Sequence, residues 1–479
     1  MRELEKTFRT LVQWMVKHPH EVLAARQEVQ LKLLKKRFVY GDSAMQTTLT
    51  PVFLKRKSLD KIRRTSEILD ALIEKVIALY FTDPYVRGYY PIHFEIPREW
   101  LHSETGYRRA SVISRHDILF DGKNLKFIEF NTDNPGGKGW TDLLELVFRE
   151  HPLYRDLIDF TEVTDRPVLR GLMESVLRCN EEFGGPSRPR IALTSFRDTG
   201  SRGDEEIVRD YFIEHGIEAN LLDARDLELR AGGLYSNQVK YDVMLRSIKA
   251  HFFLNYPRQL VDFHRGVQEK AACMVNSWRA LLGAEKSVMS FITNPMNHHY
   301  FTAEEVRVIK DHVPWTRMFD ESVVLSPEGQ EVSLKAFLLE NRERLVIKPS
   351  AGAGGYGVQV GRATNPVEWK ETIEAHIGSP TWVAQEFVEI PRIELPIIKG
   401  NKVVVESRFL NLSPYVFGGK YVGVLGRVSS KDVININAGG GMIPVLPLRE
   451  SRPEGVMAGG DASSAEAGAD EGLLSAEEG

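Results

Sequence analysis

The sequence predicts an α/β (α+β) protein built from several domains. Three patterns support this fold class. Helical spacing of apolar residues fills residues 1–80, alternating apolar and polar residues form two short strands within 112–130, and strands alternate with a helix within 189–248. A chain of 479 residues is longer than the roughly 250–300 residues at which one hydrophobic core stops growing. We therefore expect domain boundaries near residues 80, 165, 273 and 450.

The composition excludes several classes of protein. With 42% hydrophobic and 27% charged residues, the chain is typical of a globular protein. It contains no apolar run of the roughly 20 residues that span a bilayer, and its charged N-terminus lacks the apolar core of a leader. Cys179 and Cys273 lie far apart in apolar surroundings, which argues against a disulfide framework and a Cys-based metal site. We expect a cytoplasmic protein without a membrane partner.

The net charge gives no indication of a polyanionic partner. The whole chain carries −4, but residues 451–479 alone carry −6, so the remainder carries +2. This acidic, Ala- and Gly-rich tail is predicted to be disordered. Basic clusters at Lys35–Arg37 and Lys55–Arg64 lack the aromatic residues on which nucleic-acid bases stack. We interpret them as solvated helix faces and expect no nucleic-acid partner; salt-sensitive RNA binding is the alternative.

A β-hairpin is predicted in residues 81–165. Two apolar-alternating runs, 112–120 and 126–130, flank the turn at Asp121–Asn124. The first strand carries Arg115 and Asp117. A helix is expected to begin at Thr141.

The polar residues of this hairpin predict a metal site. Glu129 and Asn131 are two positions apart and therefore point to the same face, which Arg115 and Asp117 can share when the strands pair. Two carboxylates and an amide carbonyl then converge as hard oxygen ligands suited to Mg²⁺. Arg115 could hold a phosphate beside the metal. The alternative is an ordinary solvent-facing hairpin, but all four residues together, followed by the Gly-rich stretch NTDNPGGKG, favour the metal site.

Residues 166–273 have the rhythm of a βαβ unit. A buried-type strand at 189–196 precedes a helix at 203–216, and strands at 217–227 and 241–248 follow. This order predicts parallel strands. The turn after the first strand contains glycine but no GxGxxG pattern, so we infer no dinucleotide.

Residues 274–450 contain a second set of candidate ligand-binding groups. Lys286 begins a predicted helix, and the strand Leu345–Lys348 leads into the Gly-rich loop Ser350–Gly357. Such a loop lets backbone N–H groups approach phosphate oxygens without interference from a Cβ. The alternative is a tight hairpin with a flexible tip. Further strands follow, and Arg427 lies on one of them, where a long cation needs a partner.

In combination, these motifs resemble the ATP-grasp ligases. That family uses a lysine before the central fold, a strand lysine followed by a Gly-rich flap, a hinge strand for adenine, and a set of acidic and Glu-x-Asn metal ligands. Here the metal set precedes the other parts, which resembles the circularly permuted members of the glutathionylspermidine synthase type and uncharacterised permuted ATP-grasp proteins. The resemblance covers roughly residues 80–450.

The resemblance implies a circularly permuted ATP-grasp fold, with a helical N-terminal region and a Rossmann-like βαβ domain ahead of the nucleotide-binding part. The cofactors implied are ATP and two Mg²⁺ ions, the ions held by Asp117, Glu129 and Asn131. Arg115 and Arg427 are the implied catalytic residues. Glu389 or Glu394 is expected to bind the ribose. The implied nucleotide-binding residues are Lys286, Lys348, Ser350, Gly352, Gly354, Gly355, Tyr356, Gly357, Gln385, Glu386, Phe387, Val388 and Glu389.

The activity that the resemblance implies is an ATP-dependent ligation of a carboxylate to an amine. The carboxylate attacks the γ-phosphorus, and the amine displaces phosphate from the acyl phosphate. Asp133, Asn134 and Lys138 are expected to line the acceptor site. Tyr356 stands at the flap tip where many such loops carry a basic residue. No pattern fixes the two substrates or the oligomeric state, and a non-catalytic ATP-binding scaffold is the alternative function.

Overall fold

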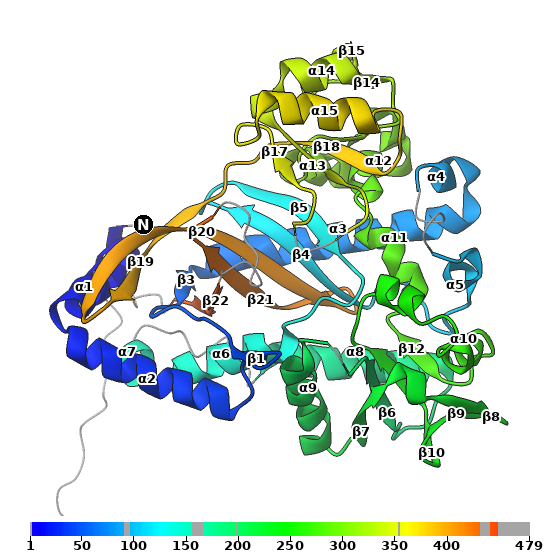
Figure 1. The fold of residues 1–479 in the computed structure, drawn as a ribbon, viewed down its shortest axis with the longest axis horizontal. Coiled ribbons are helices and arrows are strands. Elements are labelled where there is room, and N and C mark those ends of the chain that lie inside the picture. The colour runs from blue at the N-terminus through cyan, green and yellow to red at the C-terminus, as the bar shows by residue number, and fades with distance from the viewer. Residues whose placement is uncertain are drawn as a thin grey trace, which may run out of the picture.

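The computed structural model describes residues 2–90, 96–155, 166–197, 199–352, 355–431 and 441–448. The predicted disorder of the tail at 451–479 lies outside these residues. Figure 1 shows a large twisted sheet in the middle, a smaller sheet with two helices above it, and a parallel sheet at the lower right. Within the described part of the chain, no helix combines the length and apolar character needed to cross a membrane.

The N-terminal region is mostly helical, as predicted. Its helices are α1 (Arg2–Lys17), α2 (Pro19–Lys35) and α3 (Arg56–Thr82), and short strands β1 (Val39–Tyr40), β2 (Ser43–Ala44) and β3 (Val52–Leu54) lie between them. The apolar stripe of α3 is fully buried, and the helix packs against the large sheet (Figure 1). β3 pairs in parallel with β23 (Val445–Pro447), which ties this region to the far end of the described chain.

The large sheet is antiparallel and contains the predicted hairpin. Its order is β22-β21-β20-β4-β5, and a sixth strand, β19, pairs with β20. The pairing of β4 with β5 around the turn confirms the predicted hairpin. The strands are β4 (Ile113–Phe120), β5 (Leu125–Asn131), β19 (Arg392–Lys399), β20 (Lys402–Phe417), β21 (Lys420–Ser429) and β22 (Gly441–Ile443).

The predicted βαβ unit forms a four-stranded parallel sheet in the order β12-β11-β6-β7. Its strands and helices are β6 (Ile191–Ser195), α9 (Arg202–Glu214), β7 (Ala219–Asp223), β11 (Val243–Arg246), α10 (Val261–Gln268) and β12 (Cys273–Val275). The chain leaves β6 toward β7 on one side and leaves β11 toward β12 on the other. The carboxyl ends of β6 and β11 therefore form a topological switch point, where open α/β sheets bind ligands.

The sequence analysis missed a second, three-stranded sheet between β7 and β11. It consists of β8 (Glu228–Arg230), β9 (Gly233–Ser236) and β10 (Val239–Tyr241), paired antiparallel. Strands of three or four residues are too short for a clear alternation of apolar and polar positions. α6 (Lys138–Glu150) also begins before the predicted Thr141, since Asp204 accepts hydrogen bonds from the backbone N–H groups of Gly137 and Gly139.

A further sheet belongs to the small subdomain, defined here as residues 313–390. Its antiparallel order is β13-β18-β16-β17, and α14 and α15 cover it (Figure 1). It has its own hydrophobic core around Trp315, Phe319, Trp369 and Ile373. The elements are β13 (Thr316–Met318), β14 (Val323–Leu325), β15 (Glu331–Ser333), α14 (Leu334–Glu340), β16 (Leu345–Pro349), β17 (Gln359–Val360), α15 (Pro366–His376) and β18 (Trp382–Glu386).

Short helices connect these parts. α11 contacts α3 and β5, and α12 contacts β13. Lys286 immediately precedes α12, which confirms the prediction that it begins a helix. The connecting helices are α4 (Pro84–Gly88), α5 (Arg98–His102), α7 (Pro152–Arg155), α8 (Pro167–Phe183), α11 (Leu281–Ala284), α12 (Ser287–Thr293) and α13 (Ala303–His312).

Candidate nucleotide-binding site

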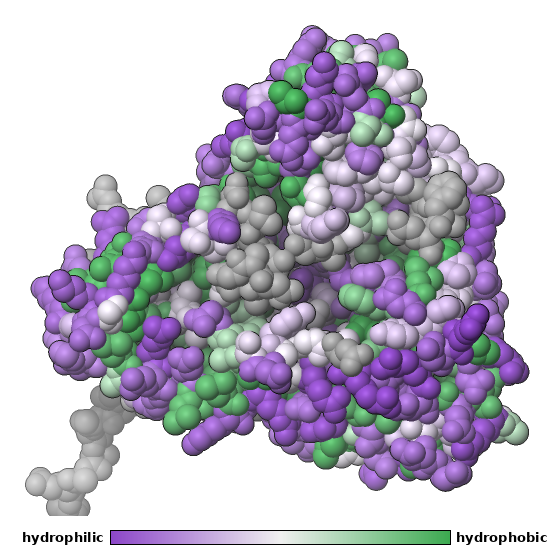
Figure 2. Space-filling view, viewed as in Figure 1, coloured by the Kyte–Doolittle hydropathy of each residue, from purple (hydrophilic) through white to green (hydrophobic). Residues whose placement is uncertain are grey.

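A cavity lies between the β4–β5 hairpin and the small subdomain. The empty space in it, including the part that is open to solvent, is about 1140 Å³, and Figure 2 shows apolar side chains in the recess beneath the small subdomain. The walls come from segments more than two hundred residues apart in the chain. Of the predicted site residues, those that line it are Asp117, Glu129, Lys286, Lys348, Gly352, Gly355, Tyr356, Gln385, Glu386, Phe387, Val388 and Arg427.

The register of the hairpin brings the four predicted residues onto one face. Asp117 pairs directly with Glu129, and Arg115 pairs directly with Asn131. Directly paired residues share a face of the sheet, and residues two apart on a strand share it as well. A β-bulge follows Asp117 and inserts Ile128 opposite it. The convergence of these side chains was predicted; the bulge has no signal in the sequence.

Asp117 is held by groups from β20 and β21. Its carboxylate accepts hydrogen bonds from Arg427 at 2.7 Å and from the Ser413 hydroxyl at 2.9 Å, and Arg115 lies 3.9 Å away. Burial alone would raise the pKa of Asp117, but the charges of Arg427 and Arg115 hold it below its usual value. Arg427 also donates to Asn411 Oδ1 at 2.6 Å. The carboxylate is therefore ionised and fixed.

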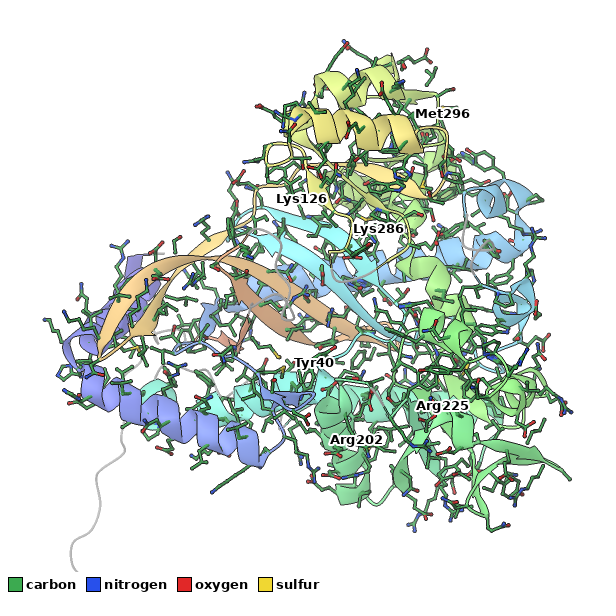
Figure 3. The ribbon with its side chains drawn as sticks, in the orientation of Figure 1. Tyr40, Lys126, Arg202, Arg225, Lys286 and Met296 are labelled. Atoms are coloured by element: carbon green, nitrogen blue, oxygen red, sulfur yellow. The ribbon has the colours of Figure 1, made fainter. Side chains whose placement is uncertain are left out.

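Glu129 faces Lys286, with the ammonium 3.2 Å from Oε1. Lys286 is 6% exposed, and Figure 3 shows it beneath the small subdomain, above β4 and β5. Its backbone N–H donates to Ser350 O at 3.0 Å, and its Nζ lies 3.4 Å from Gly352 O. Burial would raise the pKa of Glu129, but Lys286 lowers it below the usual value. Lys286 therefore links the hairpin to the start of the flap: it forms an ion pair with Glu129 and contacts the backbone of Ser350 and Gly352.

Lys348 approaches the same carboxylates from β16. It is 7% exposed and donates to Ile128 O at 3.0 Å and to Gln385 Oε1 at 2.9 Å. Burial and then the charge of Lys286 lower the pKa of Lys348 to about 8. The hydrogen bond to Ile128 crosses from the small subdomain to the hairpin. A cation placed between the two bodies can bind an anion that enters between them.

The Gly-rich flap follows Lys348. Gly352, Gly355 and Gly357 adopt φ angles of 127°, 76° and 71°, which side-chain-bearing residues rarely adopt. Tyr356 at the tip is 89% exposed. Ser350 is buried and does not line the cavity, and Gly354 lies outside the described residues. The loop therefore presents backbone groups and one aromatic ring to the cavity.

The hinge after β18 forms the opposite, more apolar end of the cavity. Gln385 uses its side chain internally, because its amide donates to Thr316 Oγ1 at 3.1 Å and its carbonyl accepts from Lys348. Backbone groups and the side chains of Glu386, Phe387 and Val388 remain at the wall. Apolar residues complete this end and suit a planar base; they are Leu119, Ile128, Val346, Val358, Val360 and Ile390.

The two carboxylates predicted for the ribose lie outside the lining of the cavity. Glu389 forms a surface ion pair with Arg362 at 2.8 Å, and Glu394 is exposed on β19. Glu386 is the hinge carboxylate that lines the cavity. The sequence analysis predicted Glu386 as a nucleotide-binding hinge residue and did not consider it for the ribose.

The donor set on the hairpin fits Mg²⁺. Asp117, Glu129 and Asn131 supply two carboxylates and an amide carbonyl on one face, and Mg²⁺ takes one or two carboxylates together with water and phosphate oxygens. Among the described residues, no group of three or more His, Cys, Asp or Glu side chains could hold a metal ion. The remaining ligands of an ion at this face therefore have to come from water and phosphate.

The sequence analysis missed two polar residues of the site. Ser413 and Asn411 on β20 hold Asp117 and Arg427. The contacts of Ser413 and Asn411 reach 296 and 293 residues back along the chain, and no local pattern signals them.

Two of the three residues predicted to line an acceptor site, Asp133 and Lys138, have partners within the protein. Asp133 forms a buried ion pair with Arg246 at 2.6 Å and accepts from the backbone N–H of Ala250 at 2.9 Å. Lys138 donates to Pro135 O at 2.9 Å. Both polar atoms of the Asn134 side chain are buried without a hydrogen-bond partner in the described part of the chain. These residues shape the loop after β5 that carries Asn131.

Comparison with known proteins supports the predicted fold. No protein-family model and no curated protein matches the chain. A glutathione synthetase-like effector from Globodera pallida, solved in its apo form, is similar in structure with a TM-score of 0.62 at 13% identity, over 90% of this chain and 97% of that one. The chain thus shares the fold of that protein over nearly its whole length. This finding supports, at the level of the fold, the resemblance to the ATP-grasp ligases.

Two other solved structures align less well. A putative γ-glutamylcysteine synthetase from Methylobacillus flagellatus aligns with a TM-score of 0.40 at 11% identity, over 79% of this chain and 88% of that one. A RimK domain ATP-grasp protein from Sphaerobacter thermophilus aligns with a TM-score of 0.26 at 16% identity, over 53% and 89%. These superpositions are too loose to bear on function.

Proposed function

We propose that the protein is an ATP- and Mg²⁺-dependent ligase that joins a carboxylate to an amine through an acyl phosphate. One observation carries the proposal. One cavity brings an acidic hairpin face, two buried lysines, a Gly-rich flap and an apolar hinge together. The acidic face suits metal ions, the lysines and flap suit phosphates, and the hinge suits a base.

Each group then has a definite task. Lys286 and Lys348 neutralise charge on the phosphates, and the flap backbone covers them and excludes water. Gln385 fixes the ammonium of Lys348, and the hinge orients the base. Arg115 and Arg427 stabilise charge on the transferred phosphoryl group. Positioning and electrostatics, rather than covalent chemistry by the protein, accelerate this type of reaction.

Asp117, Glu129 and Asn131 would hold the metal. Mg²⁺ bound there would neutralise the triphosphate and polarise the γ-phosphorus for attack. A carboxylate oxygen of the substrate would form a bond to that phosphorus as the bond to ADP breaks. The amine would then attack the acyl carbon, inorganic phosphate would leave, and the amine would lose a proton. The products are the amide, ADP and phosphate.

The order of the parts along the chain supports circular permutation. The acidic hairpin at 113–131 precedes Lys286, Lys348 and the hinge, although all of them line one cavity. The four-stranded parallel sheet between them is consistent with the predicted Rossmann-like domain. We therefore also propose the permuted arrangement, with domain boundaries near residues 80, 165, 273 and 450.

A second candidate function is ATP binding without ligation. It is favoured by the fact that cations of the chain itself already hold both carboxylates: Arg427 contacts Asp117 and Lys286 contacts Glu129. If these pairs persist with nucleotide bound, the carboxylates of Asp117 and Glu129 cannot bind a metal ion, and the protein can act as a binding module.

The test is a measurement of ADP release by the full-length protein with Mg²⁺, ATP and pooled carboxylates and amines. The ligase proposal predicts release that depends on both co-substrates and is lost in Glu129→Gln. Release that survives this substitution would contradict the proposal. Tight binding of ATP with no turnover under any pool would instead support the second function.

A further inference from the structure

The aromatic ring of the hinge is held from outside the cavity. Phe387 lines the cavity and is half-buried. The guanidinium carbon of Arg362 lies 3.6 Å from the centre of this ring, so the cation covers one of its faces. Arg362 does not itself line the cavity. It can therefore act on a bound base through Phe387 rather than by direct contact.

Arg362 is fixed in turn by its surroundings. Its guanidinium donates a hydrogen bond to the Glu389 carboxylate at 2.8 Å. The backbone around it forms a tight turn after β17, in which Ala363 and Thr364 each donate an N–H to Val360 O at 2.9 Å. The turn and the ion pair together place the guanidinium over the ring. Glu389, which the sequence analysis expected at the ribose, here holds this cation instead.

The hinge backbone beside the ring is also anchored. The N–H of Phe387 donates to Arg344 O at 2.8 Å. With its backbone fixed, the side chain can still turn between rotamers, and the guanidinium over one face limits that rotation. A side chain that is ordered before a ligand arrives loses less entropy when the ligand binds. The contact with Arg362 therefore prepares the ring for a ligand that packs against it.

From these contacts we infer that Arg362 is a positioning residue for the nucleotide, because it holds Phe387 in the orientation on which the base stacks. The inference rests on the proposed function and adds a residue to the base-binding end of the site. Bases stack on aromatic side chains, and the ring offers them the face that Arg362 leaves open. Arg362 should therefore affect ligands that carry a base and leave the binding of phosphates unchanged.

The experiment compares two ligands of the full-length protein: a non-hydrolysable ATP analogue, and tripolyphosphate, which carries the phosphates without a base. Isothermal titration in the presence of Mg²⁺ measures both affinities. Arg362→Met should weaken the analogue by about two- to fivefold, the range of an exposed cation–π contact. The affinity for tripolyphosphate should stay the same, a result that a general loosening of the fold would not give.

A double-mutant cycle tests whether Arg362 acts through the ring. Phe387→Ala should weaken the analogue by about fivefold or more, since a stacking surface is lost. Adding Arg362→Met to Phe387→Ala should cause no further loss, because residues that act through one contact are not additive.

The matched control is Arg230→Met in the three-stranded sheet. Arg230 also lies over an aromatic ring, at 5.4 Å from the centre of Tyr235, and also forms an ion pair with a carboxylate, at 2.6 Å from Glu228. These three residues do not line the cavity. The substitution should change neither affinity.

The proposed function and the inference fail in different ways. If the wild type does not bind the ATP analogue, the proposed function fails. If the wild type binds it, the inference is overturned by unchanged affinity in Arg362→Met, by equal weakening of tripolyphosphate, or by an additive loss in the double variant.

Discussion

The two faces of β4 differ in the kind of contact that holds them. Arg115 and Asp117 point toward the cavity side, where they meet ion pairs and hydrogen bonds from other strands. Ser114 and His116 point to the opposite face and are 1% and 0% exposed. Consecutive side chains of one strand therefore serve two surfaces.

Asp70 of α3 organises the buried face. It accepts hydrogen bonds from Ser114 Oγ at 2.6 Å and from Arg109 at 2.6 Å, and its Oδ1 lies 3.4 Å from His116 Nε2. Asp70 is 2% exposed, so no ligand can take the place of these contacts. On the cavity face, by contrast, the proposed function requires that nucleotide phosphates and metal ions replace the contacts of Glu129 and Asp117. The comparison predicts that one face stabilises the strand and that the other binds the ligand.

The largest effect is expected from Glu129→Gln on the cavity face. The substitution removes a metal-binding charge and the ion pair with Lys286, so turnover should fall by about two orders of magnitude or more. Thermal unfolding should change little by comparison. Glu228→Gln, at an exposed site far from the cavity, is the matched control. Steady-state ADP release measures turnover, and calorimetry measures thermal unfolding. If the variant unfolds at a lower temperature but keeps its turnover, the cavity face stabilises the strand as the buried face does, and the proposed difference between the faces is wrong.

The buried face should show the opposite pattern in Asp70→Ala. Removing Asp70 leaves the buried Ser114 hydroxyl and the His116 ring without this partner, and leaves Arg109 only its longer contact with Glu74 at 3.8 Å, so the free energy of unfolding should fall by about 3 kcal/mol. Asp60→Ala removes a surface carboxylate of the same helix and should cost less than about 1 kcal/mol. Urea unfolding measures both. Loss of turnover in Asp70→Ala without loss of stability would show that this face also acts in catalysis.

The pH dependence of nucleotide binding tests Lys348. Burial and Lys286 lower its pKa to about 8, so its charge is present below that pH and is lost as pH rises through it. The affinity for Mg·ATP should therefore weaken by about tenfold between pH 7 and pH 9. Lys348→Arg keeps its charge throughout and should give a flat profile. A fluorescent ATP analogue provides the measurement; identical profiles for the two proteins would remove Lys348 from the phosphate site.

The smallest effect is expected from Ser413→Ala. It removes one neutral donor to Asp117, and Arg427 remains, so the loss should be about 1 kcal/mol, or a few-fold in kcat/KM. The stability of the fold should be nearly unchanged. Ser429→Ala, a buried serine of the neighbouring strand away from Asp117, serves as the comparison. A loss as large as that of Glu129→Gln would mean that Ser413 contacts the reacting groups.

Local periodicity predicted the functional strand pair well. Alternation of apolar residues and the Asp121–Asn124 turn determined the hairpin, and the spacing of Glu129 and Asn131 determined their common face. Lys286 before α12 and Lys348 before the flap were likewise found from neighbouring residues. These features depend on contacts within about twenty residues, which leave a periodic trace in the sequence.

Contacts between distant segments could not be predicted in this way. The hydrogen bonds from Ser114 to Asp70 and from Arg427 to Asp117 join residues 44 and 310 positions apart. Side chains at such sites look like ordinary polar residues in the sequence. The resemblance to a family assigned the lysines and the flap to a nucleotide, whereas the partners of each charge became apparent only from the packing.

The most direct test is a crystal structure with a non-hydrolysable ATP analogue and Mn²⁺ in place of Mg²⁺. The account predicts a nucleotide with its base at Phe387 and Val388, its phosphates beside Lys286 and Lys348, and an anomalous Mn²⁺ peak in contact with Glu129 and Asn131. A nucleotide bound elsewhere, or phosphates in this cavity with no metal at Glu129, would contradict it.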